Sequence, residues 1–205
     1  MAVKSFMAGD VLWLAPQGWI IHDPEFLSPA STAELLETLK DGLDWRQQPI
    51  RLFGREVMQP RLIDFHGDTG TRYRYSGLIL EASGWPVELE KLRDRLANDS
   101  GERFNTVLCN LYRGGNDSMG WHADDEQELG PDPIVASISL GATRRFLLRP
   151  RGGGRSIEFR PRGGSLLLMG GDLQHHWQHQ VPKTARSIGE RINLTFRRVV
   201  MRPRS

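Results

Sequence analysis

Short apolar runs, broken by glycine, proline and charged residues, dominate the chain from about residue 104 onward. Runs of four to eight apolar residues bounded by turn residues are typical of half-buried or buried strands. They predict strands at residues 106–112, 134–140, 145–149, 156–159, 165–169 and 191–199. Strands of this length and spacing favour an antiparallel β sandwich or jelly roll.

Two segments before these runs carry the three- and four-residue spacing of an amphipathic helix. The first begins at Ser28-Pro29 and extends to about residue 41; the second begins after Pro86 and extends toward residue 98. The leucines that form the two stripes are Leu35, Leu36 and Leu39, and Leu89, Leu92 and Leu96. Because each helix has a single apolar stripe, we expect both helices to pack outside one sheet, giving an α+β, mainly β fold.

The other segments are less regular. Residues 1–30 are expected to be irregular because Pro16, Pro24 and Pro29 interrupt any long element. Residues 51–80, rich in Gly, Arg and Tyr, are expected to form hairpins or a flexible flap. No repeat or linker divides the chain, which predicts a single domain over residues 1–205, with an extension and first helix at 1–50 and the β core at 104–200.

Composition adds few constraints. The 205 residues are 25% charged and 39% hydrophobic, as in ordinary globular proteins. The single cysteine, Cys109, excludes an intrachain disulfide framework and agrees with a reducing cytosol. No apolar stretch approaches the roughly 20 residues of a membrane span, and no hydrophobic signal core follows Lys4. We therefore expect a cytoplasmic protein that is not in a membrane.

Basic residues are unevenly distributed, although the net charge is only +2. Seven arginines and one acid, Glu158, lie between Arg144 and Arg162, and Arg197, Arg198, Arg202 and Arg204 follow near the end. Such a cluster could bind phosphates, or it could be the solvated surface of a hairpin. The arginines alone leave both interpretations open.

Candidate metal ligands occur in Trp121-His122-Ala123-Asp124. In a strand, residues i and i+2 face the same side, so His122 and Asp124 could converge on one ion. A third ligand could come from His175, His176 or His179, and His179 is favoured because it stands twelve residues before Arg191. Two imidazoles and one carboxylate suit an open Fe(II) site, and an arginine offers a two-pronged partner for a carboxylate. A catalytic zinc site is the competing metal interpretation.

Five segments together closely resemble the AlkB family of Fe(II)/2-oxoglutarate dioxygenases, which remove alkyl groups from nucleobases. They are Asn110-Leu111-Tyr112-Arg113, residues 117–126, Ser139-Leu140-Gly141-Ala142, residues 177–182 and residues 191–197. The resemblance runs from about Pro60 to Arg198, and the first fifty residues resemble nothing that we can name.

This resemblance implies a double-stranded β-helix core in which His122, Asp124 and His179 hold the iron. It implies that Arg191 pairs with the distal carboxylate of 2-oxoglutarate and is catalytically essential together with the three ligands. The other implied co-substrate residues are Asn110 and Tyr112 beside Arg191, Arg197 near the proximal carboxylate, and Asn193 and Thr195 lining the pocket. O2 is the second co-substrate. A dianion that leaves water needs such cationic and hydrogen-bonding partners.

The resemblance also implies a substrate base that is flipped out of its stack. Tyr73-Arg74-Tyr75-Ser76-Gly77 is similar to the family's nucleotide-recognition flap, and Tyr73 is expected to stack on the base. Asp125 and Glu126 are similar to positions that contact the base edge, and acids suit the positive charge of N1-methyladenine and N3-methylcytosine. We expect nucleic-acid phosphates to bind arginines near this site, namely Arg144, Arg145, Arg149 and Arg151.

The implied activity is repair of alkylated DNA by direct reversal, in which the methyl group leaves as formaldehyde while 2-oxoglutarate becomes succinate and CO2. The expected partner is alkylated DNA, with RNA left open, and the expected state is a monomer. Alternatives are an RNA demethylase, a hydroxylase of proteins or other substrates, and a non-catalytic nucleic-acid-binding module. The three intact ligand positions argue against the last alternative.

Overall fold

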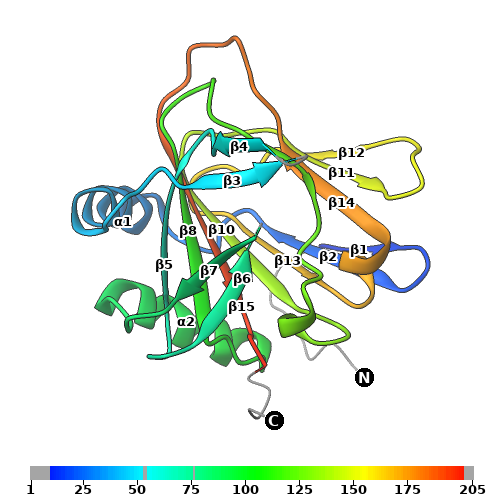
Figure 1. The fold of residues 1–205 in the computed structure, drawn as a ribbon, viewed down its shortest axis with the longest axis horizontal. Coiled ribbons are helices and arrows are strands. Elements are labelled where there is room, and N and C mark those ends of the chain that lie inside the picture. The colour runs from blue at the N-terminus through cyan, green and yellow to red at the C-terminus, as the bar shows by residue number, and fades with distance from the viewer. Residues whose placement is uncertain (1–9, 53–54, 76, 201–205) are drawn as a thin grey trace.

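Two antiparallel sheets form the body of the protein in the computed structural model, which describes residues 10–52, 55–75 and 77–200 (Figure 1). The main sheet has seven strands, which in spatial order are β1 (Asp10–Leu14), β2 (Gly18–Asp23), β13 (Leu166–Gly170), β10 (Val135–Gly141), β15 (Arg191–Arg197), β8 (Thr106–Tyr112) and β5 (Leu62–Gly67). The second sheet has four, in the order β12 (Ile157–Phe159), β11 (Phe146–Pro150), β14 (Trp177–Val181) and β9 (Met119–His122).

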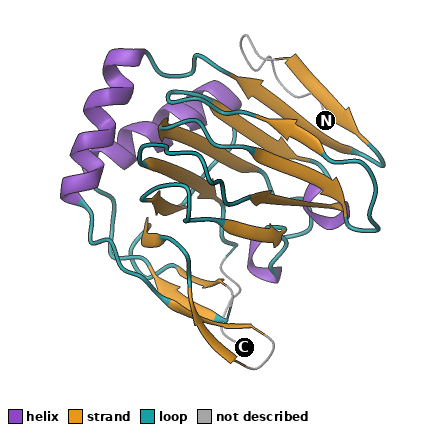
Figure 2. Ribbon diagram, turned by 90° about the horizontal axis from the view of Figure 1, so that it is seen from above, coloured by secondary structure: helices purple, strands orange, loops and turns teal. Residues whose placement is uncertain are grey.

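Two hairpins and two long helices complete the described fold. The hairpins are β3 (Pro49–Leu52) with β4 (Arg55–Met58), and β6 (Arg72–Tyr75) with β7 (Leu78–Glu81). The long helices are α1 (Pro29–Gly42) and α2 (Val87–Ser100), which lie on one side of the molecule (Figure 2). Shorter helical turns are η1 (Gln127–Leu129) and α3 (Leu173–His176). No helix in the described ranges is both long and apolar enough to cross a membrane.

The helix boundaries follow from local chemistry. Ser28 caps α1 by accepting a hydrogen bond from the backbone N–H of Ser31 at 3.2 Å, and proline occupies the first turn, where no N–H is needed. Gly101 ends α2 in the left-handed conformation, at φ 73°. The leucines at the centre of both stripes, Leu39, Leu89, Leu92 and Leu96, are buried in the core that joins the helices to the main sheet. Burial of each such side chain contributes about 1.5–3 kcal/mol.

Period-two alternation gives the main sheet two different faces. On β15, Ile192, Leu194 and Phe196 enter the core beneath the helices. The alternate residues of the same strand, Arg191, Asn193, Thr195 and Arg197, are also buried, although they are polar or charged. They face the second sheet, where a separate apolar cluster formed by residues such as Tyr112, Phe146 and Met169 packs around them. Polar side chains are therefore concentrated between the two sheets.

The fold confirms the predicted jelly roll with helices on one sheet. The two helices end within two residues of the predicted limits, and all six predicted strands form within two residues of theirs. Strands β9 and β14 were not predicted because their sequences, MGWH and WQHQV, contain no run of apolar residues.

Two predictions about the first half of the chain were wrong. Residues 1–30 are not all irregular, because β1 and β2 form a hairpin whose turn contains Pro16, with Pro24 just past its end. The prolines thus bound the strands instead of breaking them. Residues 51–80 are not all a flap either, since β5 pairs with β8 at the edge of the main sheet. The sheet therefore extends beyond the range 104–200 that was expected for the β core, and a nucleotide-recognition role for the two hairpins stays a prediction.

Candidate metal and co-substrate site

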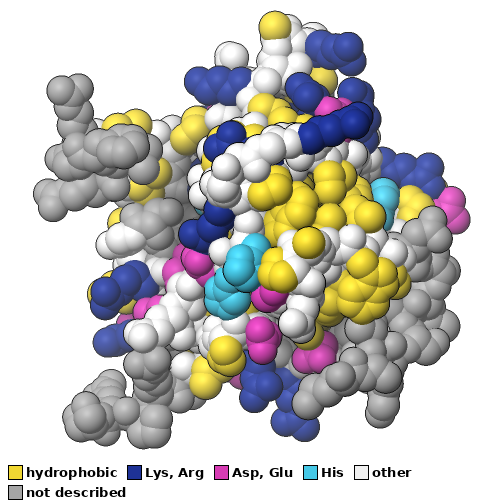
Figure 3. All heavy atoms as spheres, turned by 90° about the vertical axis from the view of Figure 1, so that its right-hand side faces the viewer, with side chains coloured by type: hydrophobic (Ala, Val, Ile, Leu, Met, Phe, Trp, Pro, Cys, Tyr) yellow, Lys and Arg dark blue, Asp and Glu magenta, His cyan; other side chains and the backbone are white. Residues whose placement is uncertain are grey.

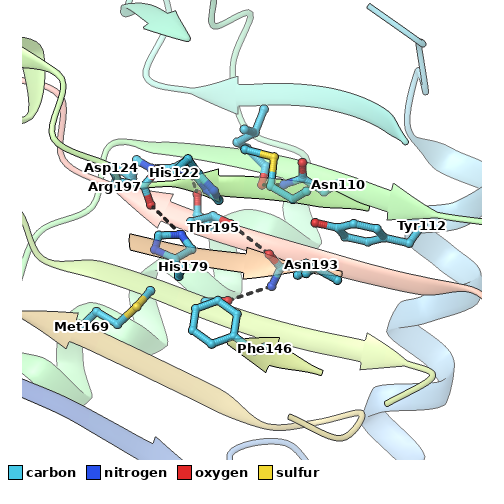
Figure 4. Close-up of a pocket in the computed structure, with 14 residues that line it drawn as sticks. Asn110, Tyr112, His122, Asp124, Phe146, Met169, His179, Asn193, Thr195 and Arg197 are labelled. Atoms are coloured by element: carbon cyan, nitrogen blue, oxygen red, sulfur yellow. Dashed lines mark hydrogen bonds and ion pairs between the residues drawn. The ribbon is translucent and has the colours of Figure 1, made fainter. Parts of the chain in front are cut away.

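Three predicted ligands meet between the sheets. His122 is the last residue of β9, and His179 lies opposite it on β14, with the two ring centroids 4.1 Å apart. Asp124 follows two residues after His122, and one potential ligand atom from each of the three residues lies within 4.8 Å of the others. Figure 4 shows these residues together at one end of a pocket, with Tyr112 at the other end.

The reason given for pairing His122 with Asp124 was wrong, even though the two side chains do converge. Asp124 lies beyond the end of β9, so strand alternation does not orient it. Instead, Asp124 Oδ1 accepts a hydrogen bond of 2.7 Å from Arg197 Nη2. Its other oxygen, Oδ2, has no hydrogen-bond partner among the described residues and lies 3.9 Å from His179 Nε2. One carboxylate oxygen is therefore held and the other is free to bind a metal.

The protonation states suit metal binding. Burial, together with the neighbouring His122, lowers the pKa of His179 to about 3, and burial also lowers the pKa of His122. Burial opposes ionisation of Asp124, but the charge of Arg197 and the two imidazoles outweigh it and lower the pKa of Asp124 to about 2. Near neutral pH the site therefore presents two neutral imidazoles and one carboxylate, which are the forms that bind a cation. Two His and one carboxylate are the facial ligand set of non-haem Fe(II) oxygenases.

Arg191 marks the other end of the polar interior. It is 1% exposed, and its Nη2 donates a hydrogen bond of 3.0 Å to Ser139 Oγ. Its Nε and Nη1 have no hydrogen-bond partner in the described part of the chain, and burial, helped by the nearby charge of Arg144, lowers its pKa. A buried guanidinium with unpaired N–H groups is costly for the protein alone. Its chemistry fits a carboxylate that arrives with a ligand.

Charge balance supports the same interpretation. Asp124 and Arg197 form an ion pair, and both are almost completely buried, so they nearly cancel each other. Arg191 remains as a buried positive charge with no ion-pair partner among the described residues. A divalent metal and a dicarboxylate would add charges of opposite sign to this interior. The dianion would then have the metal at one end and the Arg191 guanidinium at the other.

The remaining predicted co-substrate residues also face the interior. Asn110 Oδ1 accepts from Arg61 Nε at 2.8 Å, and the Tyr112 ring lies 5.2 Å from Arg191 Cζ. Asn193 Nδ2 donates to Ser137 Oγ at 2.8 Å, and its Oδ1 accepts from Thr195 Oγ1 at 3.2 Å. These bonds fix the polar side chains before any ligand binds. The structure therefore brings every predicted metal and co-substrate residue to the inner face, while their ligand contacts stay predictions.

Sequence reasoning missed several residues of the pocket. Ser137 and Ser139 hold Asn193 and Arg191, and Phe146 stacks on His179 at a centroid distance of 5.2 Å. A signal for the two serines did exist, because they occupy alternate positions of the otherwise apolar run 134–140. Nothing in the sequence distinguishes Phe146 from an ordinary core phenylalanine.

The predicted substrate residues differ in burial and in the partners that they contact. Tyr73 is completely buried and stacks on Phe65, and its hydroxyl donates a 2.9 Å hydrogen bond to Glu126 Oε2. Burial and the charge of Asp124 raise the pKa of Glu126. Asp125 forms an ion pair with Arg151 near the surface. Stacking of Tyr73 on a base and contacts of the two acids with a base edge stay predictions, and Ser76 of the same motif lies outside the described residues.

The four candidate phosphate-binding arginines occupy different environments. Arg145 is exposed and pairs with Glu158 at 2.8 Å, and Arg149 Cζ lies 4.0 Å from the centre of the Trp121 ring. Arg144 was wrongly predicted to bind phosphate. It is 3% exposed, and its guanidinium donates to the backbone carbonyls of Gly114, Asp117 and Pro182. The tail residues Arg202 and Arg204 lie outside the described residues.

Comparisons with known proteins agree with this geometry. Residues 20–197 match the model of the 2OG-Fe(II) oxygenase superfamily. The human alpha-ketoglutarate-dependent dioxygenase alkB homolog 3 is 38% identical over 191 residues, which cover 88% of this chain and 66% of that protein. The mouse DNA oxidative demethylase ALKBH2 is 38% identical over 159 residues, covering 74% of this chain and 66% of that protein.

The chain thus spans about two thirds of the length of these relatives. The solved structure of OsALKBH1 aligns with a TM-score of 0.65 over 92% of this chain and 100% of that one. At 15% sequence identity, this likeness is evidence for the fold alone.

Proposed function

Because this chain belongs to the 2OG-Fe(II) oxygenase superfamily, and within it to the AlkB family, we propose that it is an Fe(II)- and 2-oxoglutarate-dependent demethylase of alkylated DNA bases. One observation carries the proposal. The triad His122, Asp124 and His179 shares one buried polar interior with Arg191, whose guanidinium has two unpaired nitrogens. A metal site and a separate site for a carboxylate suit a metal-dependent reaction that consumes an organic acid.

The protein's own residues position the reactants and exclude water. The two imidazoles and Asp124 Oδ2 would hold the metal on one side, and Arg191 would hold the distal carboxylate of 2-oxoglutarate at the other end of the interior. Bound Fe(II) would supply the redox chemistry, in which O2 oxidises 2-oxoglutarate to succinate and CO2 and the methyl carbon to the level of formaldehyde. Tyr112, Asn193 and Thr195, held by their neighbours, would orient the co-substrate between these ends.

A nucleic-acid substrate is supported by charge. Glu126, half-buried and close enough to Asp124 for their charges to interact, would face a base that carries positive charge, such as N1-methyladenine. Figure 3 shows several Lys and Arg side chains along the upper rim of one face of the molecule. The residues that line one groove include Arg145, Arg160 and Arg186, with Glu158 as the one acid. Such a surface would attract a phosphate backbone in a salt-dependent way. Several relatives, including the mouse protein, are named DNA oxidative demethylases. The proposal also includes a monomeric, cytoplasmic enzyme, which rests on the sequence alone.

The test is incubation of the protein with Fe(II), 2-oxoglutarate and oligonucleotides that each carry one methylated base. N1-methyladenine and N3-methylcytosine are placed in single-stranded DNA, duplex DNA and RNA of one sequence. Mass spectrometry reads loss of the methyl group, and parallel assays read formaldehyde and succinate. We expect equal amounts of both products, loss of the methyl group from DNA, and no turnover by Asp124→Ala.

The other outcomes separate the alternatives. Turnover of RNA alone would replace DNA with RNA as the substrate. Succinate formation that depends on a protein or lipid substrate, with none from methylated oligonucleotides, would exclude the nucleobase part of the proposal. Absence of Fe(II)–2-oxoglutarate charge-transfer absorption in the intact protein would exclude the enzyme altogether and leave a binding module.

A further inference from the structure

Gln174 connects two segments that carry metal ligands. It lies in α3 and is 0% exposed, five residues before His179 in the chain. Its side-chain Oε1 accepts a 3.0 Å hydrogen bond from the backbone N–H of Asp124, fifty positions away in sequence. The contact therefore joins the loop that carries Asp124 to the segment that leads into β14.

Asp124 needs such a contact because no strand partner holds it. Strand β9 ends at His122, and η1 begins only at Gln127, so residues 123–126 have no regular structure. Arg197 fixes the end of the Asp124 side chain but not its backbone. Without Gln174, the buried N–H of Asp124 would lose its hydrogen bond and the loop would have more freedom to rotate the carboxylate.

Burial of the Gln174 amide is unfavourable on its own. Its Nε2 has no hydrogen-bond partner among the residues that the structure describes, although the residue is fully buried. A buried amide with an unpaired N–H group costs free energy that an apolar residue of similar size would avoid. Among the described residues, the hydrogen bond to Asp124 is therefore what the polar group of this side chain contributes.

A second arginine supports the same arrangement. Arg151 pairs with the carboxylate of Asp125, and its Nη2 also donates a 3.2 Å hydrogen bond to the backbone carbonyl of Gln174. The backbone N–H of Arg151 donates to the carbonyl of His176 at 2.8 Å. The loop next to Asp124 is thus tied to α3 at two neighbouring residues, one through Gln174 and one through Arg151.

We propose that Gln174 is a positioning residue for the metal site, which orients the Asp124 carboxylate toward the ion by holding the backbone of its loop. This inference rests on the proposed metal site and names a residue that supports a ligand without binding the ion itself. Replacement of a residue that hydrogen-bonds a metal ligand typically weakens metal affinity about 10–100-fold.

The test compares metal binding by Gln174→Met, which removes the acceptor and keeps the length, with Gln174→Glu, which keeps an acceptor oxygen. Gln180→Met is the matched control, because Gln180 lies on β14 with its side chain partly exposed and no side-chain hydrogen bond in the described structure. Anaerobic titration with Fe(II), and separately with Co(II), gives dissociation constants, and thermal melting of the metal-free proteins reports folding.

We expect Gln174→Met to weaken Fe(II) binding about 10–100-fold, with Gln180→Met unchanged and Gln174→Glu binding more tightly than Gln174→Met. The Fe(II)–2-oxoglutarate absorption band should also shift in Gln174→Met, because the carboxylate ligand is reoriented. Should Gln174→Met fold poorly, Gln174→Asn replaces it, since the shorter amide cannot reach the Asp124 N–H and is expected to weaken binding in the same way.

Equal metal affinity in all folded variants would overturn the inference, as would a lower melting temperature with an unchanged dissociation constant. Equal loss in Gln174→Glu and Gln174→Met would also overturn it, because the acceptor oxygen would then be irrelevant. These outcomes differ from failure of the proposed function, in which the unaltered protein itself would bind no Fe(II) and give no charge-transfer band.

Discussion

Replacement of Arg191 by methionine should separate co-substrate binding from stability. Methionine keeps much of the length of the side chain but removes the charge and all five N–H donors. Among the residues that the structure describes, the Arg191 guanidinium donates a hydrogen bond to Ser139, and its Nε and Nη1 have no hydrogen-bond partner although the residue is 1% exposed. Arg191 should therefore contribute mainly to the affinity for a dicarboxylate and little to the stability of the ligand-free protein.

The magnitude follows from the two unpaired nitrogens. Each hydrogen bond from a charged donor to a carboxylate contributes about 1.5–3 kcal/mol, so two of them contribute about 3–6 kcal/mol. Because each 1.4 kcal/mol is tenfold in affinity, Arg191→Met should weaken 2-oxoglutarate binding by a factor of about 10²–10⁴. In the ligand-free protein, the lost bond to Ser139 costs about 1.5–3 kcal/mol, and removal of a buried charge with unpaired N–H groups should offset most of that loss.

The assay is anaerobic titration of the Fe(II)-loaded protein with 2-oxoglutarate, followed by charge-transfer absorption, with urea unfolding of the ligand-free protein beside it. Arg186→Met is the control, because it removes an equal charge from an exposed position. A dissociation constant for Arg191→Met within about threefold of the original would refute the reasoning. So would a loss of more than about 2 kcal/mol in ligand-free stability, since Arg191 would then act mainly in folding.

Three further predictions concern the metal site and the substrate. Asp124→Ala should abolish Fe(II) binding by calorimetry, whereas Asp125→Asn should retain it; binding by the former would exclude Asp124 as a ligand. The pKa of His179 is about 3 in the folded protein and 6.5 ordinarily, so only the unfolded chain takes up this proton below pH 6.5. The stability that His179 contributes is therefore present above pH 6.5 and lost as pH falls toward 3, about 2 kcal/mol of it between pH 7 and 5. Urea unfolding of the metal-free protein should show this loss of stability, and the loss should be smaller in His179→Gln. If the stability of both proteins depends on pH in the same way, the loss does not come from His179. Glu126→Gln should slow turnover of cationic N1-methyladenine more than that of a neutral methylated base, and equal slowing of both would remove Glu126 from base recognition.

Particular residues show which features of the site could be predicted from the sequence. The short apolar run predicted a strand at 191–199, and the structure has one at Arg191–Arg197, with both arginines buried toward the interior. The conformation of Asp124 could not be predicted, because it depends on hydrogen bonds from Arg197 and to Gln174, which are 73 and 50 positions away. Arg144 was misassigned for the same reason: its three acceptor carbonyls come from loops distant in sequence.

By itself, the sequence determined the two long helices, six of the strands and the types of residue suited to a metal, because residue periodicity and the chemical preference of a cation for imidazole and carboxylate are local properties. Only the tertiary structure decided that Asp124 presents a single free oxygen, that Arg191 stays unpaired in the interior and that Gln174 holds the ligand loop. Each of these depends on which distant groups come within hydrogen-bonding distance when the two sheets close on each other, and no local pattern specifies that.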